Sequence, residues 1–271
     1  MIIGNREFFD KRTYIMGILN VTPDSFSDGG KHNQIDFALS QTEKMINEGA
    51  DVIDVGGEST RPGYTKISDY EEIQRIIPVI KEIKKRFDVP LSVDTYKSEV
   101  ARAALENGAD MINDIWGLKY DVNMGKIIKA YNASCCLMHN RGNANYTSFV
   151  DDVIADLRES IDIAHSAGIE ANKILIDPGI GFAKSYEQNL QITNNIEKLG
   201  ILGMPVLLGA SRKSMIGLTL GLPVEERLEG TLATTAIAVM KGCRFVRVHD
   251  IKENKRVITM TERILYGTDK N

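Results

Sequence analysis

The sequence lacks the features that mark secreted, disulfide-stabilised or membrane-spanning proteins. Only 3 of its 271 residues are cysteine, too few for a disulfide framework. Two of them, Cys135 and Cys136, are adjacent in an expected strand, so their side chains should point to opposite faces. No hydrophobic run reaches the length of a membrane span, and the N-terminus has no signal-peptide pattern. We therefore expect a protein of a reduced compartment, the cytoplasm.

An excess of charge of either sign is also missing. The chain has 33 Lys and Arg against 37 Asp and Glu, for a net charge of −4. Such a balance gives no general attraction to nucleic acid or to an anionic membrane, so we expect no partner of either kind. The content of 43% apolar and 26% charged residues is ordinary for a globular protein with a sizeable core.

What the sequence does contain is a regular alternation of short apolar runs and amphipathic helical patterns. After a small hairpin expected over residues 1–9, eight strands are predicted at 14–19, 51–55, 91–93, 111–114, 134–138, 174–176, 205–209 and 245–248. The helices between and after them are predicted at 35–48, 70–86, 98–107, 126–131, 151–167, 188–199, 228–240 and 255–265, with a long loop from 214 to 226.

Eight strand–helix pairs in this length indicate the α/β class and a closed (β/α)8 TIM barrel forming a single domain over residues 1–271. The alternative is an open, doubly wound sheet. Such a sheet usually carries one dominant nucleotide loop, but no G-x-G-x-x-G motif follows the first strand. The run from Gly209 to Ser214 is similar to a phosphate-binding loop, yet it lacks the glycine before the lysine.

Polar residues stand where the predicted strands end, and in a barrel these ends converge on one mouth. Asp and Asn can bind the edge of a flat, amide-rich heterocycle, Lys can meet a ring carbonyl, and Arg can stack on a ring. We interpret the set as a site for a heterocycle and an anion, with Asp114 and Glu58 in structural roles. The set comprises Asn20, Glu58, Asp94, Asn113, Asp114, His139, Asp177, Ser211, Arg212, Lys213, Arg247 and His249.

The residues around these positions resemble the dihydropteroate synthase family of bacteria, a family of pterin-binding enzymes. The matching motifs follow the family's order along nearly the whole chain, and the first two are long and specific. They are Met16-Gly-Ile-Leu-Asn-Val-Thr-Pro-Asp-Ser-Phe-Ser-Asp-Gly-Gly30, Asp54-Val-Gly-Gly-Glu-Ser-Thr-Arg-Pro-Gly63, Ser92-Val-Asp-Thr95, Ile112-Asn-Asp114, Leu137-Met-His139, Asp177-Pro-Gly-Ile-Gly-Phe182, Ser211-Arg-Lys213 and Arg247-Val-His249. Asn140 and Arg141 follow no family pattern and receive no role.

The resemblance implies an activity and a division of the site. The family joins 4-aminobenzoate to a hydroxymethyl-dihydropterin diphosphate, releasing diphosphate and 7,8-dihydropteroate in folate synthesis. By motif, Asp94, Asn113, Asp177 and Lys213 would bind the pterin edge, with Arg247 over its face. Asn20, Thr60, Arg61 and His249 would bind the diphosphate. Thr60, Pro62, Phe182, Lys213 and Ser214 would form the aminobenzoate site, for which sulfonamides compete in this family.

The implied chemistry needs Mg²⁺, with Asn20 among its ligands, and assigns catalytic roles to Asp94, Lys213 and Asn20. Diphosphate leaves readily once cations take up its charge. Positive charge on the pterin methylene can then be stabilised by Asp94 and Asp177. The loops 21–30 and 56–66, rich in Gly and Pro or Ser, are expected to close over this charge and exclude water.

Three other functions fit part of the pattern. A pterin-binding methyltransferase of the corrinoid-dependent type shares the barrel, but the Ser211–Lys213 motif and the 59–62 loop argue against it. A metal hydrolase could use His139, His249 and Asp177, but no H-x-H pair follows the first strand. A non-catalytic pterin-binding protein also stays open. The family resemblance further favours a homodimer formed through the last helices.

Overall fold

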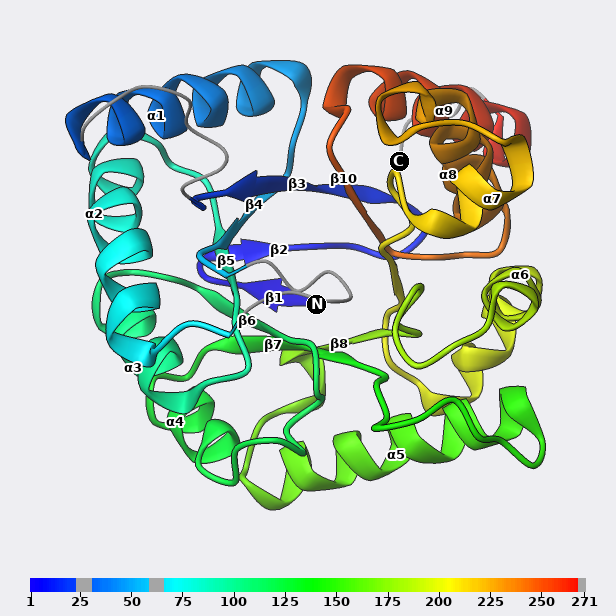
Figure 1. Ribbon diagram of the computed structural model, residues 1–271, viewed down its shortest axis with the longest axis horizontal. Helices are drawn as coiled ribbons and strands as arrows, with labels where there is room; N and C mark the ends of the chain where they lie inside the picture. Colours follow the sequence, from blue (N-terminus) through cyan, green and yellow to red (C-terminus); the bar gives the residue numbers. More distant parts are fainter. Residues whose placement is uncertain (23–30, 59–65, 268–271) are drawn as a thin grey trace.

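A parallel eight-stranded sheet forms the centre of the molecule (Figure 1). The structure is a computed structural model that describes residues 1–22, 31–58 and 66–267, with the backbone alone for residues 31–33. The strands lie in the order β8-β7-β6-β5-β4-β3-β10-β9. Their bounds are β3 Tyr14–Asn20, β4 Val52–Gly56, β5 Leu91–Asp94, β6 Met111–Asp114, β7 Ser134–Met138, β8 Ile174–Asp177, β9 Leu207–Leu208 and β10 Phe245–Val248.

The two outer strands of this order, β8 and β9, meet and close the sheet into a barrel. They are joined by an isolated parallel bridge between Ile176 and Val206. The Ile176 amide also donates to the Pro205 carbonyl at 3.0 Å. The predicted (β/α)8 barrel is therefore confirmed, and its seventh strand is shorter than the predicted 205–209.

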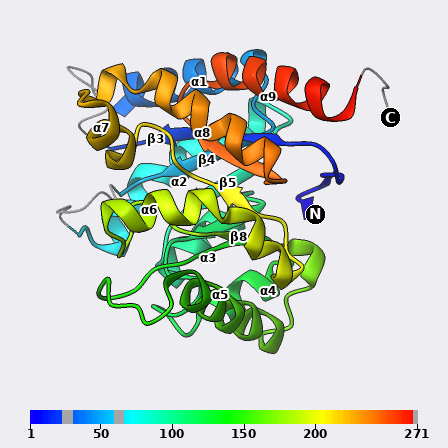
Figure 2. The same ribbon diagram turned by 90° about the vertical axis from the view of Figure 1, so that its right-hand side faces the viewer.

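Helices surround the barrel, and α1 and α9 lie side by side to complete the ring (Figures 1 and 2). None of the helices in the described ranges is both long and apolar enough to cross a membrane. The helices are α1 Lys31–Glu48, α2 Asp69–Arg86, α3 Ser98–Glu106, α4 Met124–Ala130, α5 Phe149–Ser166, α6 Tyr186–Asn194, α7 Ser214–Leu220, α8 Leu228–Met240 and α9 Ile251–Tyr266, with short 3-10 turns η2 Ala171–Lys173, η3 Ile196–Leu202 and η4 Val224–Glu226.

Two expectations for the helices were wrong. The loop predicted over 214–226 contains α7 and η4, and the helix predicted over 188–199 is divided between α6 and η3. Gly217 lies inside α7, although a glycine at this point of the sequence is more typical of a loop. A Cβ at Gly217 would lie 2.2 Å from the Arg227 guanidinium, so the glycine serves close packing within a helix.

Local sequence explains how α2 forms. The Ser68 hydroxyl accepts from the Glu71 amide at 3.2 Å, which satisfies one of the free N–H groups of the first turn. The Glu71 carboxylate pairs with Arg75, one turn further along the helix. Behind this start, helical spacing places Ile76, Ile80 and Ile83 on one buried face against the barrel.

The apolar core has two layers, one between barrel and helices and one inside the barrel. Cys135 belongs to the outer layer and Cys136 to the inner one, as expected for adjacent strand residues. The inner layer is covered at the amino end of the strands by the predicted hairpin, β1 Ile2–Ile3 and β2 Arg6–Glu7. After the hairpin, Phe8 packs against Tyr14 and Phe245, with ring centroids 4.8 and 5.2 Å apart. The polar interior therefore gathers at the opposite, carboxyl end.

Candidate active site at the mouth of the barrel

The carboxyl ends of β4, β5, β6 and β10 bring a buried network of ionic and amide side chains together. Arg247 donates to Asp54 through Nε at 2.6 Å and to Asp94 through Nη2 at 2.7 Å. Asn113 donates to the same Asp54 oxygen at 3.2 Å. Three of the predicted pterin-binding residues, Asp94, Asn113 and Arg247, thus meet in the barrel mouth.

Asp54 is a site residue that the sequence analysis did not single out. It lies within β4, two residues after the inward-facing Val52, so alternation turns its side chain into the barrel. A carboxylate inside an otherwise apolar strand could have revealed it. Among the described residues, Asp54 Oδ1, Asp94 Oδ1 and Ser92 Oγ are buried without a hydrogen-bond partner. These acceptors fit the N–H groups of a bound heterocycle.

Burial sets the charges of this network. It raises the pKa of Asp94 to about 7, against the opposing effect of Arg247. For Arg247 burial opposes the charge, but Asp54 and Asp94 outweigh it and raise the pKa above its ordinary value. The guanidinium is thus a permanent cation held by two carboxylates. Its predicted position over the face of a pterin ring stays a prediction.

A second group of predicted residues lies across the β8–β9 contact. Lys213, just before α7, donates from Nζ to the Ile180 carbonyl at 2.5 Å and lies 4.9 Å from the centroid of the Phe182 ring. Asp177, at the end of β8, accepts from the Gly179 amide at 2.7 Å. Burial lowers the pKa of Lys213 to about 8, although Asp177 favours its charge. Burial also raises the pKa of Asp177.

The residues predicted for diphosphate lie partly in the described structure. His249 follows β10, and its backbone amide donates to Ser211 Oγ at 3.2 Å. The same hydroxyl lies 3.0 Å from His249 Nδ1 and so orients the imidazole ring. Asn20 ends β3 in register with Gly56 and is exposed. The predictions for Thr60, Arg61 and Pro62, and most of both expected loops, fall outside the described residues.

The sequence motifs now match both the fold and the site. The family model described as pterin binding enzyme matches residues 16–249. The chain belongs to this pterin-binding family. The dihydropteroate synthase of Clostridium beijerinckii is 59% identical over 267 residues, 98% of this chain and 99% of that protein.

Solved structures of similar proteins have the same fold. A dihydropteroate synthase from Clostridium difficile, crystallised in the presence of pteroic acid, superposes with a TM-score of 0.93 at 47% identity. It covers 97% of this chain and 100% of its own. The dihydropteroate synthase of Xanthomonas albilineans with 4-aminobenzoic acid has a TM-score of 0.90 at 41% identity, over 94% of both chains.

In this pterin-binding family member, His139 has no place in a metal cluster with His249 and Asp177. Its ring is buried between Asp156 and Lys184, at 2.9 and 2.8 Å. Burial, reinforced by Lys184, lowers the pKa of His139 to about 3. Across residues 1–22, 31–58 and 66–267, no three His, Cys, Asp or Glu side chains form a metal-binding group. The metal hydrolase alternative therefore has no support among them.

Glu58 and Asp114 make structural contacts rather than facing the mouth. Asp114 accepts from the amides of Trp116 and Leu118, at 2.9 and 2.8 Å, and so fixes the turn after β6. Glu58 pairs with the buried Lys97, which also binds Glu72. Both residues therefore have the structural roles expected from the sequence.

Proposed function

We propose that this chain is a dihydropteroate synthase. It condenses (7,8-dihydropterin-6-yl)methyl diphosphate with 4-aminobenzoate to give 7,8-dihydropteroate and diphosphate. The observation that carries the proposal is the buried acceptor group of Asp54, Asp94 and Asn113, inside a barrel that has a relative of this name at 59% identity. Pterins present a flat edge rich in N–H groups, which such acceptors suit.

The pterin is proposed to bind along the inward side of the mouth. Asp94, Asn113 and Asp177 would contact its edge, Lys213 its ring carbonyl, and Arg247 its face. The two orphaned carboxylate oxygens of Asp54 and Asp94 support this assignment because buried acceptors without donors cost free energy until a ligand satisfies them. Asp54 is thereby added to the pterin-binding set.

The aminobenzoate is proposed to bind on the side where Lys213 meets Phe182. The ring of Phe182 offers an aromatic face, and the Lys213 ammonium 4.9 Å from its centroid can attract a carboxylate. Ser214 is exposed at the start of α7, beside Lys213. Thr60 and Pro62 are proposed from the family motif alone.

The diphosphate is proposed to bind between Asn20 and His249, with Thr60 and Arg61. The imidazole of His249, oriented by Ser211, can donate a ring N–H to a phosphate oxygen. Asn20 offers one exposed amide oxygen, a hard donor that fits Mg²⁺ held mainly by phosphate oxygens and water. When bound, Mg²⁺ supplies positive charge to the leaving diphosphate. The metal requirement is part of the proposal.

These residues support a substitution at the pterin methylene carbon. The carbon–oxygen bond to diphosphate breaks, the aminobenzoate nitrogen bonds to the same carbon, and the new ammonium group loses a proton to solvent. His249 holds the departing anion, while the carboxylates of Asp94 and Asp177 stabilise positive charge on the pterin. An arylamine is a competent nucleophile at neutral pH, so no Ser or Cys nucleophile is needed.

The purified protein should form 7,8-dihydropteroate from both substrates in the presence of Mg²⁺. Chromatographic product assay combined with calorimetric titration of the pterin diphosphate tests this. Tight pterin binding without product would instead assign the non-catalytic binding protein. Methyl transfer from a methylated pterin would assign the methyltransferase alternative.

The same proposal includes a single-domain protein of the cytoplasm that forms a homodimer through its last helices. Support for the location comes from Cys135, Cys136 and Cys243, which are all buried and free. Support for the dimer comes from apolar side chains exposed on α8 and α9, including Met240, Met260 and Ile264.

A further inference from the structure

Two neighbouring loops at the barrel mouth pack backbone against backbone. The first, residues 139–148, follows β7, and the second, residues 178–185, follows β8. The His139 amide donates to the Asp177 carbonyl at 2.8 Å. A Cβ at Gly179, whose φ is +71°, would lie 2.0 Å from the His139 carbonyl oxygen. Only glycine allows this approach, which sets the two loops at a fixed separation.

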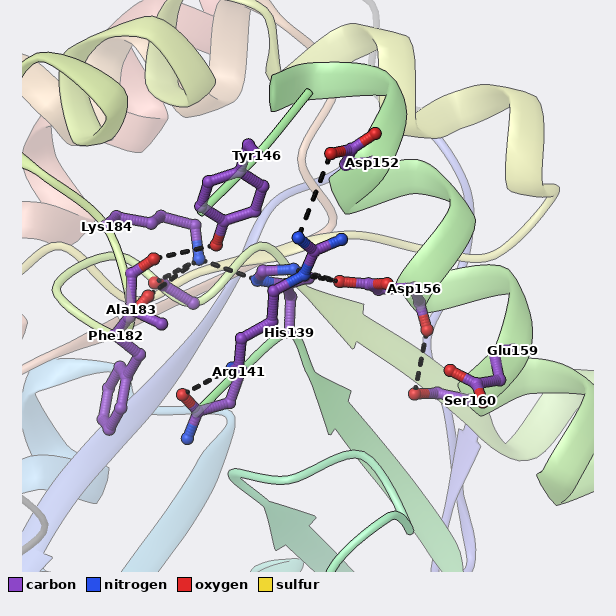
Figure 3. Close-up of polar contacts among 12 residues, drawn as sticks. His139, Arg141, Tyr146, Asp152, Asp156, Glu159, Ser160, Phe182, Ala183 and Lys184 are labelled. Atoms are coloured by element: carbon purple, nitrogen blue, oxygen red, sulfur yellow. Dashed lines mark hydrogen bonds and ion pairs between the residues drawn. The ribbon is translucent and has the colours of Figure 1, made fainter. Parts of the chain in front are cut away.

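Lys184 lies at the centre of the contacts that link the second loop to His139 (Figure 3). Its ammonium group lies 3.0 Å from the Gly179 carbonyl, 3.0 Å from the Phe182 carbonyl and 2.8 Å from His139 Nδ1. An ammonium group has three N–H donors, and here all three have an acceptor. Two of these bonds curl the loop around its own lysine, and the third ties it to the first loop.

The ring of His139, which accepts from Lys184, is itself oriented by further contacts (Figure 3). Because Nδ1 of His139 accepts from Lys184, its Nε2 must carry the proton that is donated to Asp156 at 2.9 Å. Arg141 binds the same Asp156 oxygen at 2.5 Å. Tyr146 adds a second tie between the loops, donating from its hydroxyl to the Ala183 carbonyl at 2.8 Å.

The loop that Lys184 fixes carries two groups that hold Lys213. One is the Ile180 carbonyl, which accepts from Lys213 Nζ at 2.5 Å, and the other is the Phe182 ring. Both lie between Gly179 and Lys184, inside the segment that the lysine closes. Any loosening of that closure would therefore move the carbonyl and the ring together.

We propose that Lys184 is a positioning residue for aminobenzoate binding: held by His139, it fixes the loop that sets Phe182 and Lys213. This inference deepens the proposed function and rests on it. Lys184 touches no substrate in this assignment. Arg141 and Tyr146, which no family motif explained, take part by fixing Asp156, His139 and Ala183.

The test compares Lys184→Met with Lys198→Met. Methionine keeps the length of the side chain but removes all three donors, whereas Lys198 is an exposed lysine of the following η3 turn. Lys184→Met should raise the KM for 4-aminobenzoate about 10-fold or more, as loss of about 1.4 kcal/mol of binding free energy implies. The Kd for the pterin diphosphate should rise by a clearly smaller factor: Lys213 would also contact the pterin ring, but Asp94, Asn113 and Arg247 lie on other strands.

A merely structural lysine would give another result, namely a lower melting temperature with an unchanged ratio of the two affinities. Tyr146→Phe, which removes one hydroxyl, should fold like the parent and raise the same KM about 2- to 5-fold, the effect of one modest hydrogen bond. Aminobenzoate KM values within about 2-fold of the parent in every folded variant would overturn the proposal. If Lys184→Met does not fold, Tyr146→Phe decides.

A second readout does not need activity. Hydrogen exchange of peptides covering residues 178–185 should speed up in Lys184→Met and in Tyr146→Phe but not in Lys198→Met. If the parent forms no dihydropteroate, the proposed function fails regardless of the variants. If the parent is active and exchange in this loop is the same in all variants, the positioning role fails alone.

Discussion

Lys213 is proposed to contact the aminobenzoate carboxylate, so the charge of its ammonium group should control substrate binding. Burial lowers its pKa to about 8, from an ordinary value of 10.5. Charge-dependent binding of the aminobenzoate carboxylate is then complete below about pH 8 and is lost above it. Titrating 4-aminobenzoate into the enzyme with diphosphate and Mg²⁺, we expect affinity to fall up to about 10-fold per pH unit above that point.

Lys213→Arg is the control for this pH dependence, because arginine keeps its charge throughout the range. Its affinity should be lower than that of the parent, because the fork-shaped group does not reproduce the Ile180 contact, but flat across pH 8. A fall near pH 8 that persists in this variant would assign the titration to another group.

Asp177 should be needed in its charged form for pterin binding. One of its oxygens already accepts from the Gly179 amide, so Asp177→Asn keeps that bond and turns the other oxygen into a donor. This donor would face the N–H groups of the pterin, a mismatch of about 1–3 kcal/mol. The Kd for the pterin diphosphate should rise about 5- to 150-fold. Asp162→Asn, on the exposed side of α5, should leave it unchanged.

At the scale of residues, the sequence predicted Asp94, Asn113, Asp177, Lys213 and Arg247 as neighbours, since each lies at or near the carboxyl end of a strand or follows one. It did not predict Asp54 or Lys184. Asp54 lies inside a strand, where only the direction of its side chain reveals a role. Lys184 acts through carbonyl groups and His139, and these contacts exist only once two loops have met.

At the scale of secondary-structure elements, a buried ionic cluster around Lys97, the residue before α3, links α3 to the end of β4 and to α2. The ammonium group of Lys97 binds Glu58 after β4, Glu72 in α2 at 2.7 Å, and the Ile67 carbonyl at 2.8 Å. Lys97→Met would leave two carboxylates buried without a cation. We expect the free energy of unfolding to fall by about 3–5 kcal/mol, measured by urea denaturation.

The matched control is Arg86→Met, which breaks an exposed pair with Glu82 on the same helix, α2. Its cost should stay below about 1 kcal/mol. Adding Glu58→Gln and Glu72→Gln to Lys97→Met should restore part of the loss by removing the uncompensated charges. Equal costs for Lys97→Met and Arg86→Met would contradict the importance of the buried cluster.

Sequence patterns predicted the long helices better than the short ones. The long helices α2 and α5 were predicted within one or two residues, because many turns repeat the same apolar face, whereas α1 and α9 begin four residues before their predicted starts. The short helix α7 was taken for a loop, since Gly217 and Gly221 interrupt its pattern. Gly217 leaves room for the Arg227 side chain, which packs against it in space, and this contact cannot be read from the local sequence.

For the whole molecule, the barrel could be predicted by counting strand–helix pairs. The surface on which a second copy would bind could not be predicted in this way and was expected only from the family resemblance. The structure exposes apolar side chains on α8 and α9, with Met240 64%, Met260 62% and Ile264 72% exposed. We expect light scattering to give the mass of a dimer. Ile264→Glu should shift it towards 30.1 kDa, the mass of one chain.

A matched control for the dimer is Val122→Glu. Val122 is 83% exposed, but it lies just before α4, far in sequence from α8 and α9. This variant should keep the mass of the parent. A monomer in the parent, or a dimer that survives Ile264→Glu, would remove the last helices as the interface.

The bridge between Ile176 and Val206 makes the barrel a cylinder with a seam. Every other neighbouring pair of strands shares a longer ladder, so thermal breathing should concentrate where β8 meets β9. Asp177 and Lys213 stand on opposite sides of that seam, and the Lys213 bond to Ile180 already crosses it. A substrate that binds both residues would link the two sides of the β8–β9 contact. Substrate binding and the stability of the closed barrel therefore depend on the same contact, and a ligand that spans it should reduce the motion of the whole barrel.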